Sequence, residues 1–193
     1  MKNIIATIAL IAIALTIGLS FAVMTDKQPG NVSLGGAFTL TDQSGKTITE
    51  KDLLGKYTLV FFGFTNCPDV CPTTLMEISQ VMESLGEKGK ELLPVFISVD
   101  AGGDTPETMK SYLSNFNPAI IGLTGTEEQI KQVTTAYKVY YAKVDQPNST
   151  SGYTMDHSAF IYFMDRDGKY ITHLNYKDPA EKIISTLKPY LEK

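Results

Sequence analysis

The feature that most constrains the fold is an uninterrupted apolar run, YTLVFFGF at residues 57–64, rich in β-branched and aromatic side chains. A strand that is apolar at successive positions has no solvent-facing side, which is typical of a central strand covered on both faces. A second run, LLPVFISVD at residues 92–100, follows an amphipathic segment with apolar residues three and four apart. Strands that alternate with helices predict an α/β domain with a mixed central sheet flanked by helices.

Hairpins are predicted near both ends of this domain. Residues 37–49 alternate in period two around a turn at 43–46, which indicates an N-terminal hairpin. Residues 157–174 predict two strands joined by a turn at 165–168, a late β-hairpin. The residues just before it, DQPNSTSGYTMD at 145–156, show no periodicity and predict a long polar loop, a kind of segment that is often functional.

Amphipathic patterns and capping signals predict four helices. The first follows the cysteines and ends in the Gly86–Gly89 stretch, and the second begins at Thr105 with Pro106 in its first turn and runs to about Phe116. The third opens with a capping box at 126–129 and runs to about Tyr137, and the last starts at Asp178 and Pro179.

The N-terminus predicts a membrane segment. Lys2 precedes about 20 uncharged, mainly apolar residues, enough to cross a bilayer as one helix. The positive-inside rule then leaves the N-terminus cytoplasmic and exports the rest to an oxidising compartment. We therefore expect an anchor at 1–24, a linker at 25–35 and one domain at 36–193. A cleaved signal peptide ending near Ala22 is the alternative.

Charge excludes one class of partner. The formal net charge is −4 and the sequence has no basic cluster. Proteins that bind nucleic acid need a basic surface to neutralise phosphates. The sequence therefore gives no indication of a nucleic-acid partner.

The two cysteines of the chain, Cys67 and Cys71, follow the first apolar run. Because proline is tolerated only in the first turn of a helix, Pro68 and Pro72 place both thiols at a helix N-terminus, where thiolates form more readily. Four residues of spacing bring the sulfurs to one face. A disulfide over so short a loop removes little chain entropy, so redox or metal chemistry is favoured over a structural role.

A third ligand would narrow the choice of metal, and the sequence has only two histidines, His157 and His173. His157 lies at the exit of the polar loop, from which it can approach the cysteines, and is the candidate third ligand. Two thiolates and an imidazole suit Cu(I), or Zn(II) by ligand type, or Cu(II) with a weak extra ligand. Asp69 and Asp156 can be outer groups, a weak extra ligand, or ordinary solvated carboxylates.

The stretch FGFTNCPDVCPTTL at 62–75 resembles the signature of the Sco/SenC (PrrC-like) family, the membrane-anchored copper proteins of cytochrome c oxidase assembly. The resemblance continues through residues 98–125, 138–143 and 155–170, and so covers nearly the whole exported domain in order. Two positions depart from it: Asn66 stands where the motif often has His, and 101–103 (Ala-Gly-Gly) stand where Pro and charged residues are frequent.

The resemblance implies a thioredoxin-like fold with an N-terminal anchor in the cytoplasmic membrane and the domain on the periplasmic side. It implies that Cys67, Cys71 and His157 bind one copper ion as Cu(I) or Cu(II). It further implies copper delivery to the CuA site of oxidase subunit II, or reduction of that site's cysteines, with another periplasmic copper chaperone as a candidate partner. The departures at Asn66 and 101–103 remove no ligand. They affect which client protein the resemblance implies, and not the metal site.

Three alternatives stay open. A thiol–disulfide oxidoreductase without metal needs only Cys67 and Cys71, although their spacing is not that of thioredoxins. A redox or copper sensor would act through a partner. A peroxidase needs an arginine near the first cysteine, and the arginine of this chain, Arg166, lies in the late turn. The sequence thus favours a copper chaperone over an enzyme and leaves thiol reductase activity open.

Overall fold

Strands and helices alternate through the middle of the chain, as the apolar runs predict. The structure is a computed structural model that describes residues 34–149 and 151–192. The strands are β1 (Thr39–Asp42), β2 (Thr47–Thr49), β3 (Tyr57–Gly63), β4 (Leu92–Ser98), β5 (Ile121–Thr124), β6 (Tyr141–Asp145), β7 (Tyr153–His157), β8 (Phe160–Met164) and β9 (Tyr170–Asn175). The helices are η1 (Glu50–Leu53), α2 (Val70–Leu85), η2 (Gly86–Glu91), α3 (Pro106–Leu113), α4 (Glu127–Tyr137) and α5 (Ala180–Leu191).

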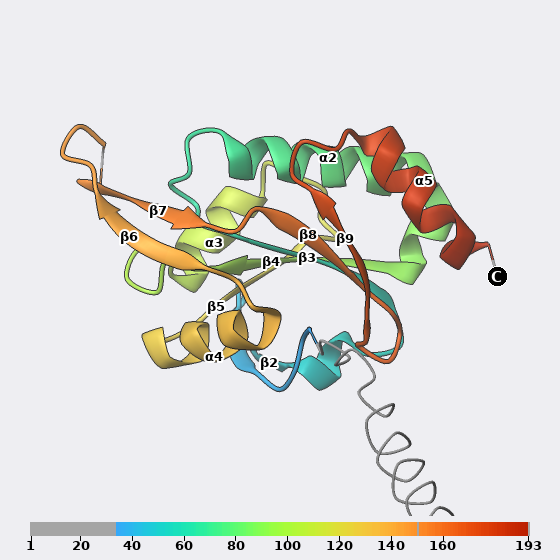
Figure 1. Cartoon of the computed structure of the whole chain (residues 1–193), viewed down its shortest axis with the longest axis horizontal. Helices are drawn as coiled ribbons and strands as arrows, with labels where there is room; N and C mark the ends of the chain where they lie inside the picture. Colours follow the sequence, from blue (N-terminus) through green and yellow to red (C-terminus); the bar gives the residue numbers. More distant parts are fainter. Residues whose placement is uncertain (1–33, 150, 193) are drawn as a thin grey trace, which may run out of the picture. The chain divides into compact units, whose positions relative to one another are not determined.

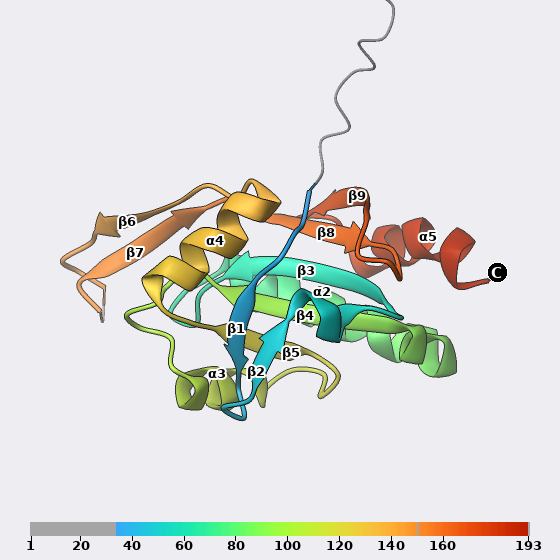
Figure 2. The ribbon, with the colours of Figure 1, turned by 90° about the horizontal axis from the view of Figure 1, so that it is seen from below.

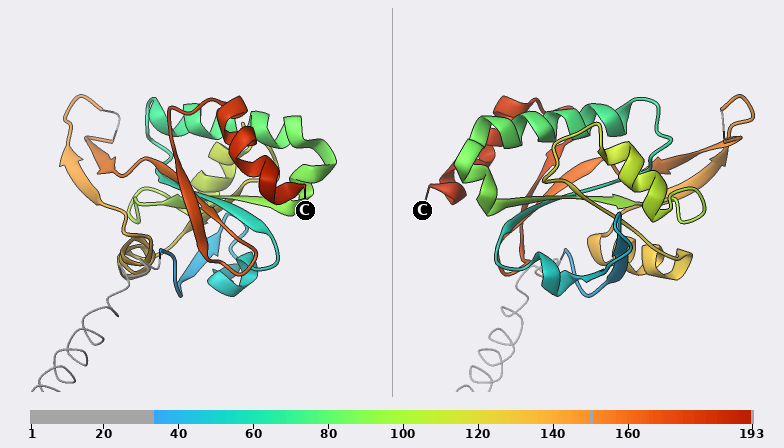
Figure 3. Two further views of the ribbon diagram at one scale, coloured as in Figure 1. Left: turned by 45° about the vertical axis from the view of Figure 1, so that its right-hand side comes forward. Right: turned by 180° about the vertical axis from the view of Figure 1, so that it is seen from behind.

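The described residues form one mixed seven-stranded sheet in the order β2-β1-β5-β4-β3-β8-β9, which confirms the predicted mixed sheet. The central strands β3, β4 and β5 run parallel, whereas β1 and β8 pair antiparallel with β5 and β3. Both predicted hairpins are present, as β1–β2 and β8–β9. A separate two-stranded sheet, β6–β7, extends beyond the seven-stranded one (Figures 1 and 3).

Helices cover both faces of the seven-stranded sheet. Figures 1 and 2 show α2, α3 and α5 on one side and α4 on the other. The apolar run that predicts a central strand is buried from Thr58 to Phe64, with Leu59, Val60, Phe61 and Phe62 each at 0% exposure. Strand β3 therefore occupies the middle of the core, and the segment that follows it starts from a rigid support.

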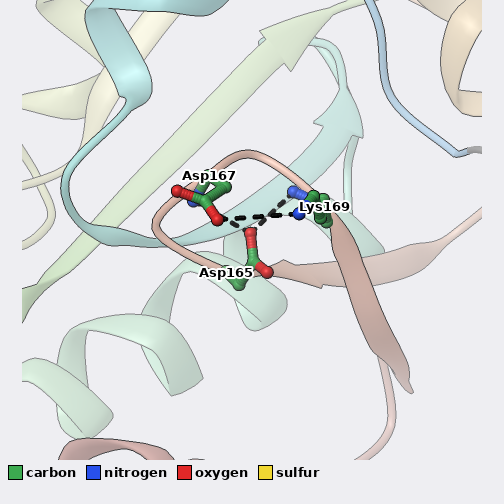
Figure 4. Close-up of polar contacts among 3 residues, drawn as sticks. All are labelled: Asp165, Asp167 and Lys169. Atoms are coloured by element: carbon green, nitrogen blue, oxygen red, sulfur yellow. Dashed lines mark hydrogen bonds and ion pairs between the residues drawn. The ribbon is translucent and has the colours of Figure 1, made fainter.

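The turn between β8 and β9 shows why that hairpin is readable from sequence. The Asp165 carboxylate accepts hydrogen bonds from the backbone N–H groups of Asp167 and Lys169, and Lys169 lies 3.7 Å from the Asp167 carboxylate (Figure 4). Gly168 adopts a positive φ of 75°, which costs glycine no strain. The predicted turn at 165–168 is confirmed.

The predicted polar loop at 145–156 is wrong at both ends, because Asp145 ends β6 and residues 153–156 belong to β7. Residues Tyr153–His157 form β7, which pairs with β6 from Tyr141 opposite His157 to Asp145 opposite Tyr153. His157 therefore ends β7 rather than beginning the late hairpin. Three of the five residues of β6 are exposed. Neither face of the hairpin is continuously buried, so its sequence does not need the alternation of apolar and polar residues by which strands are recognised.

Helix starts agree with the capping signals better than helix ends do. Thr105 and Thr126 accept hydrogen bonds from the backbone N–H groups of Thr108 and Gln129, as expected for N-caps. Helix α3 ends at Leu113, short of the predicted Phe116, and α2 passes into the 3-10 helix η2.

The predicted membrane segment at 1–24 and most of the linker at 25–35 lie outside the described residues. Within 34–149 and 151–192, none of the helices has the length and hydropathy to span a bilayer. The boundaries of anchor, linker and domain stay predictions.

Candidate metal centre

The topology brings three distant segments to one edge of the sheet. Because β3 and β4 are parallel, their carboxyl ends lie together, and the Val99 N–H donates to the carbonyl of Gly63 at 2.8 Å. Strand β8 runs antiparallel to β3, with Ile161 opposite Phe61, so β8 begins at the same edge. The residues that follow β3 and β4 and those that precede β8 therefore meet.

Both cysteines lie at the start of α2, as predicted from the prolines. Asp69 is the N-cap residue, so Cys71 is in the first turn and Cys67 is in the loop before it. The Cys71 backbone N–H donates to the Cys67 sulfur at 3.4 Å. Cys71 is fully buried, Cys67 is partly exposed, and both are free thiols. The pair thus presents one accessible and one shielded sulfur.

The two thiols share one proton unequally. The pKa of Cys67 falls to about 4, chiefly because the Cys71 thiol donates to it, and His157 and backbone N–H groups add to this against an opposing effect of burial. The pKa of Cys71 rises, because it keeps the proton that it donates to Cys67 and because burial disfavours its thiolate. Cys67 is therefore the thiolate at neutral pH.

His157 comes to this pair from 86 residues away in the chain. Its Nε2 lies 3.8 Å from the Cys71 sulfur, and its Nδ1 lies 3.1 Å from the carbonyl oxygen of Ser158. A carbonyl only accepts, so Nδ1 is the donor in this contact. Nε2 then faces sulfur either as an N–H that donates to a thiolate or, in the neutral ring, as a free lone pair for a metal ion. The rings of Phe61 and Phe64 make T-shaped contacts with the imidazole.

The donor set fits a soft metal ion. Metal–sulfur and metal–nitrogen bonds of about 2.3 and 2.0 Å at a trigonal centre put sulfur and nitrogen roughly 3.7 Å apart, close to the separation of Cys71 and His157. In the part of the chain that the structure describes, no three His, Cys, Asp or Glu side chains form a ready metal-binding cluster. Since Cys67 contacts both Cys71 and His157, small side-chain movements would close the set.

The two carboxylates expected beside the site are not brought into it. Asp69 and Asp156 are exposed. Asp156 precedes His157 in β7, and adjacent side chains of a strand point to opposite faces. Asp69 contributes its backbone N–H to the Cys67 sulfur rather than its carboxylate. Their predicted roles stay predictions.

A buried carboxylate that the sequence analysis missed lies behind the cysteine loop. Asp104 is 2% exposed and accepts hydrogen bonds from the hydroxyl of Thr65 at 2.6 Å, from its backbone N–H, and from the hydroxyl of Ser98 at 2.6 Å. Burial raises its pKa, against the effect of these hydrogen bonds. It holds the segment that leads to Cys67. The sequence signal for Asp104 was its place in the loop that follows the second apolar run, at residues 92–100.

The fold and the site together define a class. A mixed sheet with a thiol pair at the N-terminus of the helix after its central strand, matched by solved relatives, is a thioredoxin-like α/β protein, here with an imidazole facing the thiols. The sequence profile of the SCO1/SenC family matches residues 26–192. The chain belongs to the SCO1/SenC family.

Relatives of known name and structure agree. The SCO2-like protein of Rickettsia felis is 38% identical, over 97% of this chain and 97% of its own. The copper-bound structure of Bradyrhizobium japonicum ScoI is 50% identical, with a TM-score of 0.75 over 81% of this chain and 99% of that one. Copper-bound yeast Sco1 is 38% identical, with a TM-score of 0.75 over 83% and 90%.

Proposed function

We propose that this chain binds one copper ion through Cys67, Cys71 and His157 and assists the assembly of the CuA site in cytochrome c oxidase subunit II. The observation that supports this most is the approach of His157 Nε2 to the Cys71 sulfur, 3.8 Å apart across 86 residues. Copper-bound relatives at 50% and 38% identity support the choice of metal. The soft thiolates favour Cu(I), with Cu(II) as a second state.

Cys67, Cys71 and His157 would hold the copper ion so that it can still be released to a partner. Cys67 supplies a thiolate at neutral pH, Cys71 gives up its proton on binding, and His157 adds a neutral nitrogen held by the Ser158 carbonyl. Because binding releases a proton, affinity falls as pH falls. Since Cys67 is partly exposed, thiolates of a partner can replace the ligands one at a time.

The same thiols can reduce a disulfide of the client. The Cys67 thiolate attacks one sulfur of the client disulfide, and the other client sulfur leaves as a thiolate. Cys71 then attacks the Cys67 sulfur of the mixed disulfide as its proton passes to the first client thiolate, which releases the second client thiolate and leaves a Cys67–Cys71 disulfide. Two electrons pass to the client. The oxidised pair has no free thiolate, so it cannot hold copper.

We further propose that residues 1–24 anchor the chain in the cytoplasmic membrane, with the domain at 36–193 on the periplasmic side. The uncharged apolar stretch after Lys2 supports this. An upstream periplasmic copper chaperone would then load the site.

Anaerobic Cu(I) titration of the purified full chain tests the proposal. We expect one equivalent bound by the reduced protein, none by the protein with a Cys67–Cys71 disulfide, and much weaker binding by His157→Ala. His173→Ala is the matched control and should bind as the parent does, because His173 is exposed on β9 and contacts Tyr170. Equal binding by the parent and His157→Ala would refute the three-ligand site.

The low pKa of Cys67 favours one rival, a thiol–disulfide oxidoreductase that needs no metal. This rival requires the two thiols and not His157. Reduction of a disulfide substrate by His157→Ala at the parent's rate, with copper retention lost, would show that the two activities are separable. If the parent binds no copper yet reduces disulfides, the rival replaces the proposal.

A further inference from the structure

The hairpin that carries His157 is a sheet of its own. Among the described residues, β6 and β7 pair only with each other and not with the seven-stranded sheet. The pairing of β8 with β3 fixes the base of the hairpin, three residues after His157, whereas no backbone pairing holds its outer part, where Tyr153 begins β7, against the seven-stranded sheet. Side-chain contacts must hold the hairpin against the rest of the domain.

One such contact joins the hairpin to the loop after β4. The Tyr153 hydroxyl donates to Oδ2 of Asp100 at 2.6 Å, across 53 residues. Asp100 is only 5% exposed, and its Oδ1 accepts the Gly103 N–H at 3.0 Å. Donation to this carboxylate raises the pKa of Tyr153 to about 12, so the hydroxyl keeps its proton at neutral pH.

The contact belongs to a hydrogen-bonded chain that ends beside the cysteines. The Asp100 N–H donates to the Ser98 hydroxyl at 3.0 Å, and that hydroxyl donates to Asp104 at 2.6 Å. Asp104 in turn accepts from Thr65, two residues before Cys67. The position of the hairpin and the position of the cysteine loop are thus set by one network.

Local packing makes the contact specific. A Cβ at Gly103 would collide with the Asp100 carboxylate and lie 2.7 Å from the Tyr153 hydroxyl, so only glycine leaves room for the pair. Alternation in β7 puts Tyr153, Met155 and His157 on one side of the strand, and Met155 is 8% exposed. The tyrosine and the histidine therefore face the domain together.

We infer that the Tyr153–Asp100 hydrogen bond is a latch that positions His157 over the cysteines. With the latch closed, the imidazole lies within reach of Cys71. With the latch open, the hairpin moves away and withdraws the imidazole, and a metal ion held by the two thiolates alone is exposed to thiolates of a partner. Tyr153 is a positioning residue that acts through His157. The inference about the metal rests on the proposed function, whereas the inference about the hairpin does not.

Tyr153→Phe in the full chain removes the hydroxyl and keeps the ring. The metal-free readout is amide hydrogen exchange. We expect exchange in Tyr141–Asp145 and Tyr153–His157 to become about tenfold faster or more, as befits loss of a hydrogen bond to a charged acceptor, and exchange in β3 and β4 to stay as in the parent. Tyr140→Phe, at a tyrosine that is 63% exposed just before β6, is the control and should change neither. Unchanged exchange in the hairpin of Tyr153→Phe would overturn the latch.

The metal readout is the rate of Cu(I) transfer to an excess of a chelator. We expect Tyr153→Phe to release copper about tenfold faster than the parent. In a His157→Ala background the same substitution should have no further effect, because the ligand that the latch positions is gone. An equal acceleration in both backgrounds, or none in the parent, would contradict the positioning role. A parent that binds no copper would refute the proposed function and the copper part of this inference, and hydrogen exchange would still decide whether Tyr153 holds the hairpin.

Discussion

At the scale of single residues, Gly63 keeps open the space that the Cys71 sulfur occupies. A Cβ on Gly63 would lie 2.6 Å from that sulfur and 2.8 Å from the Phe96 ring, closer than packed atoms approach. The sulfur must therefore move if any side chain is added. The last residue of β3 thus fixes where the buried thiol points.

We expect Gly63→Ala to lower the free energy of unfolding by about 1–3 kcal/mol through overpacking. If displacement of the Cys71 sulfur costs ~1.4 kcal/mol of copper-binding free energy, copper affinity should fall roughly tenfold. Denaturant unfolding and Cu(I) competition measure the two effects. Gly36→Ala is the control, since its Cβ would meet only Ala136 at an ordinary 3.5 Å. Equal effects of the two substitutions would show that Gly63 has no special role.

The unequal protonation of the thiols gives a prediction in pH. With a pKa of about 4, Cys67 is already a thiolate from pH 6 to pH 8. The rate constant for iodoacetamide labelling of the reduced protein should stay nearly constant over this range, whereas that of a free cysteine rises roughly 75-fold. Stopped-flow labelling with mass spectrometry measures the rate and identifies the residue.

Two variants test the cause of this low pKa. Cys71→Ser keeps a hydrogen-bond donor beside Cys67 and should preserve the flat pH profile, whereas Cys71→Ala removes the donor and should make labelling rise with pH. A steep profile in the parent, or a first label on Cys71, would contradict the assignment of the thiolate to Cys67.

At the scale of elements, capping signals were the most readable part of the sequence. Thr126 and Gln129 form the reciprocal capping box at the start of α4, with the Gln129 side chain accepting the Thr126 N–H at 2.9 Å. The helix needs this cap because its first N–H groups have no partner within the helix.

We expect Thr126→Ala to cost about 1 kcal/mol of unfolding free energy, because it removes the side-chain acceptor of an N-cap. Thr135→Ala, on the exposed side of α4, should be neutral or slightly stabilising, since alanine is the better helix former. Chemical denaturation of both variants decides this. A loss at Thr135 as large as that at Thr126 would mean that capping is not the cause.

Strand β7 could not be predicted from the sequence. Its five residues carry Met155 as the one buried side chain, so neither a continuous apolar run nor a clear alternation appears. Its pairing with β6 is satisfied by backbone hydrogen bonds that any sequence can make. The sequence therefore predicts a loop where the structure has this strand. That the strand ends in a site residue, His157, stays a prediction.

At the scale of the whole molecule, the antiparallel entry of β8 beside β3 is what carries His157 to the cysteines. Periodicity predicts that β3 and β8 are strands but not that they are neighbours, because pairing depends on the full order of the sheet. The reach of His157 toward Cys71 was thus an expectation from its place at the exit of the polar loop and from family resemblance, and the order of the sheet played no part in it. The contact of Asp104 with Thr65 was not foreseen, because it spans 39 residues and leaves no local pattern.

X-ray absorption spectroscopy of the full chain loaded anaerobically with one equivalent of Cu(I) tests the central claim most directly. The arrangement of Cys67, Cys71 and His157 predicts a first shell of two sulfurs and one imidazole nitrogen, with the imidazole scattering absent in His157→Ala. A first shell of sulfur alone in the parent, or an imidazole signal that survives in His157→Ala, would contradict it.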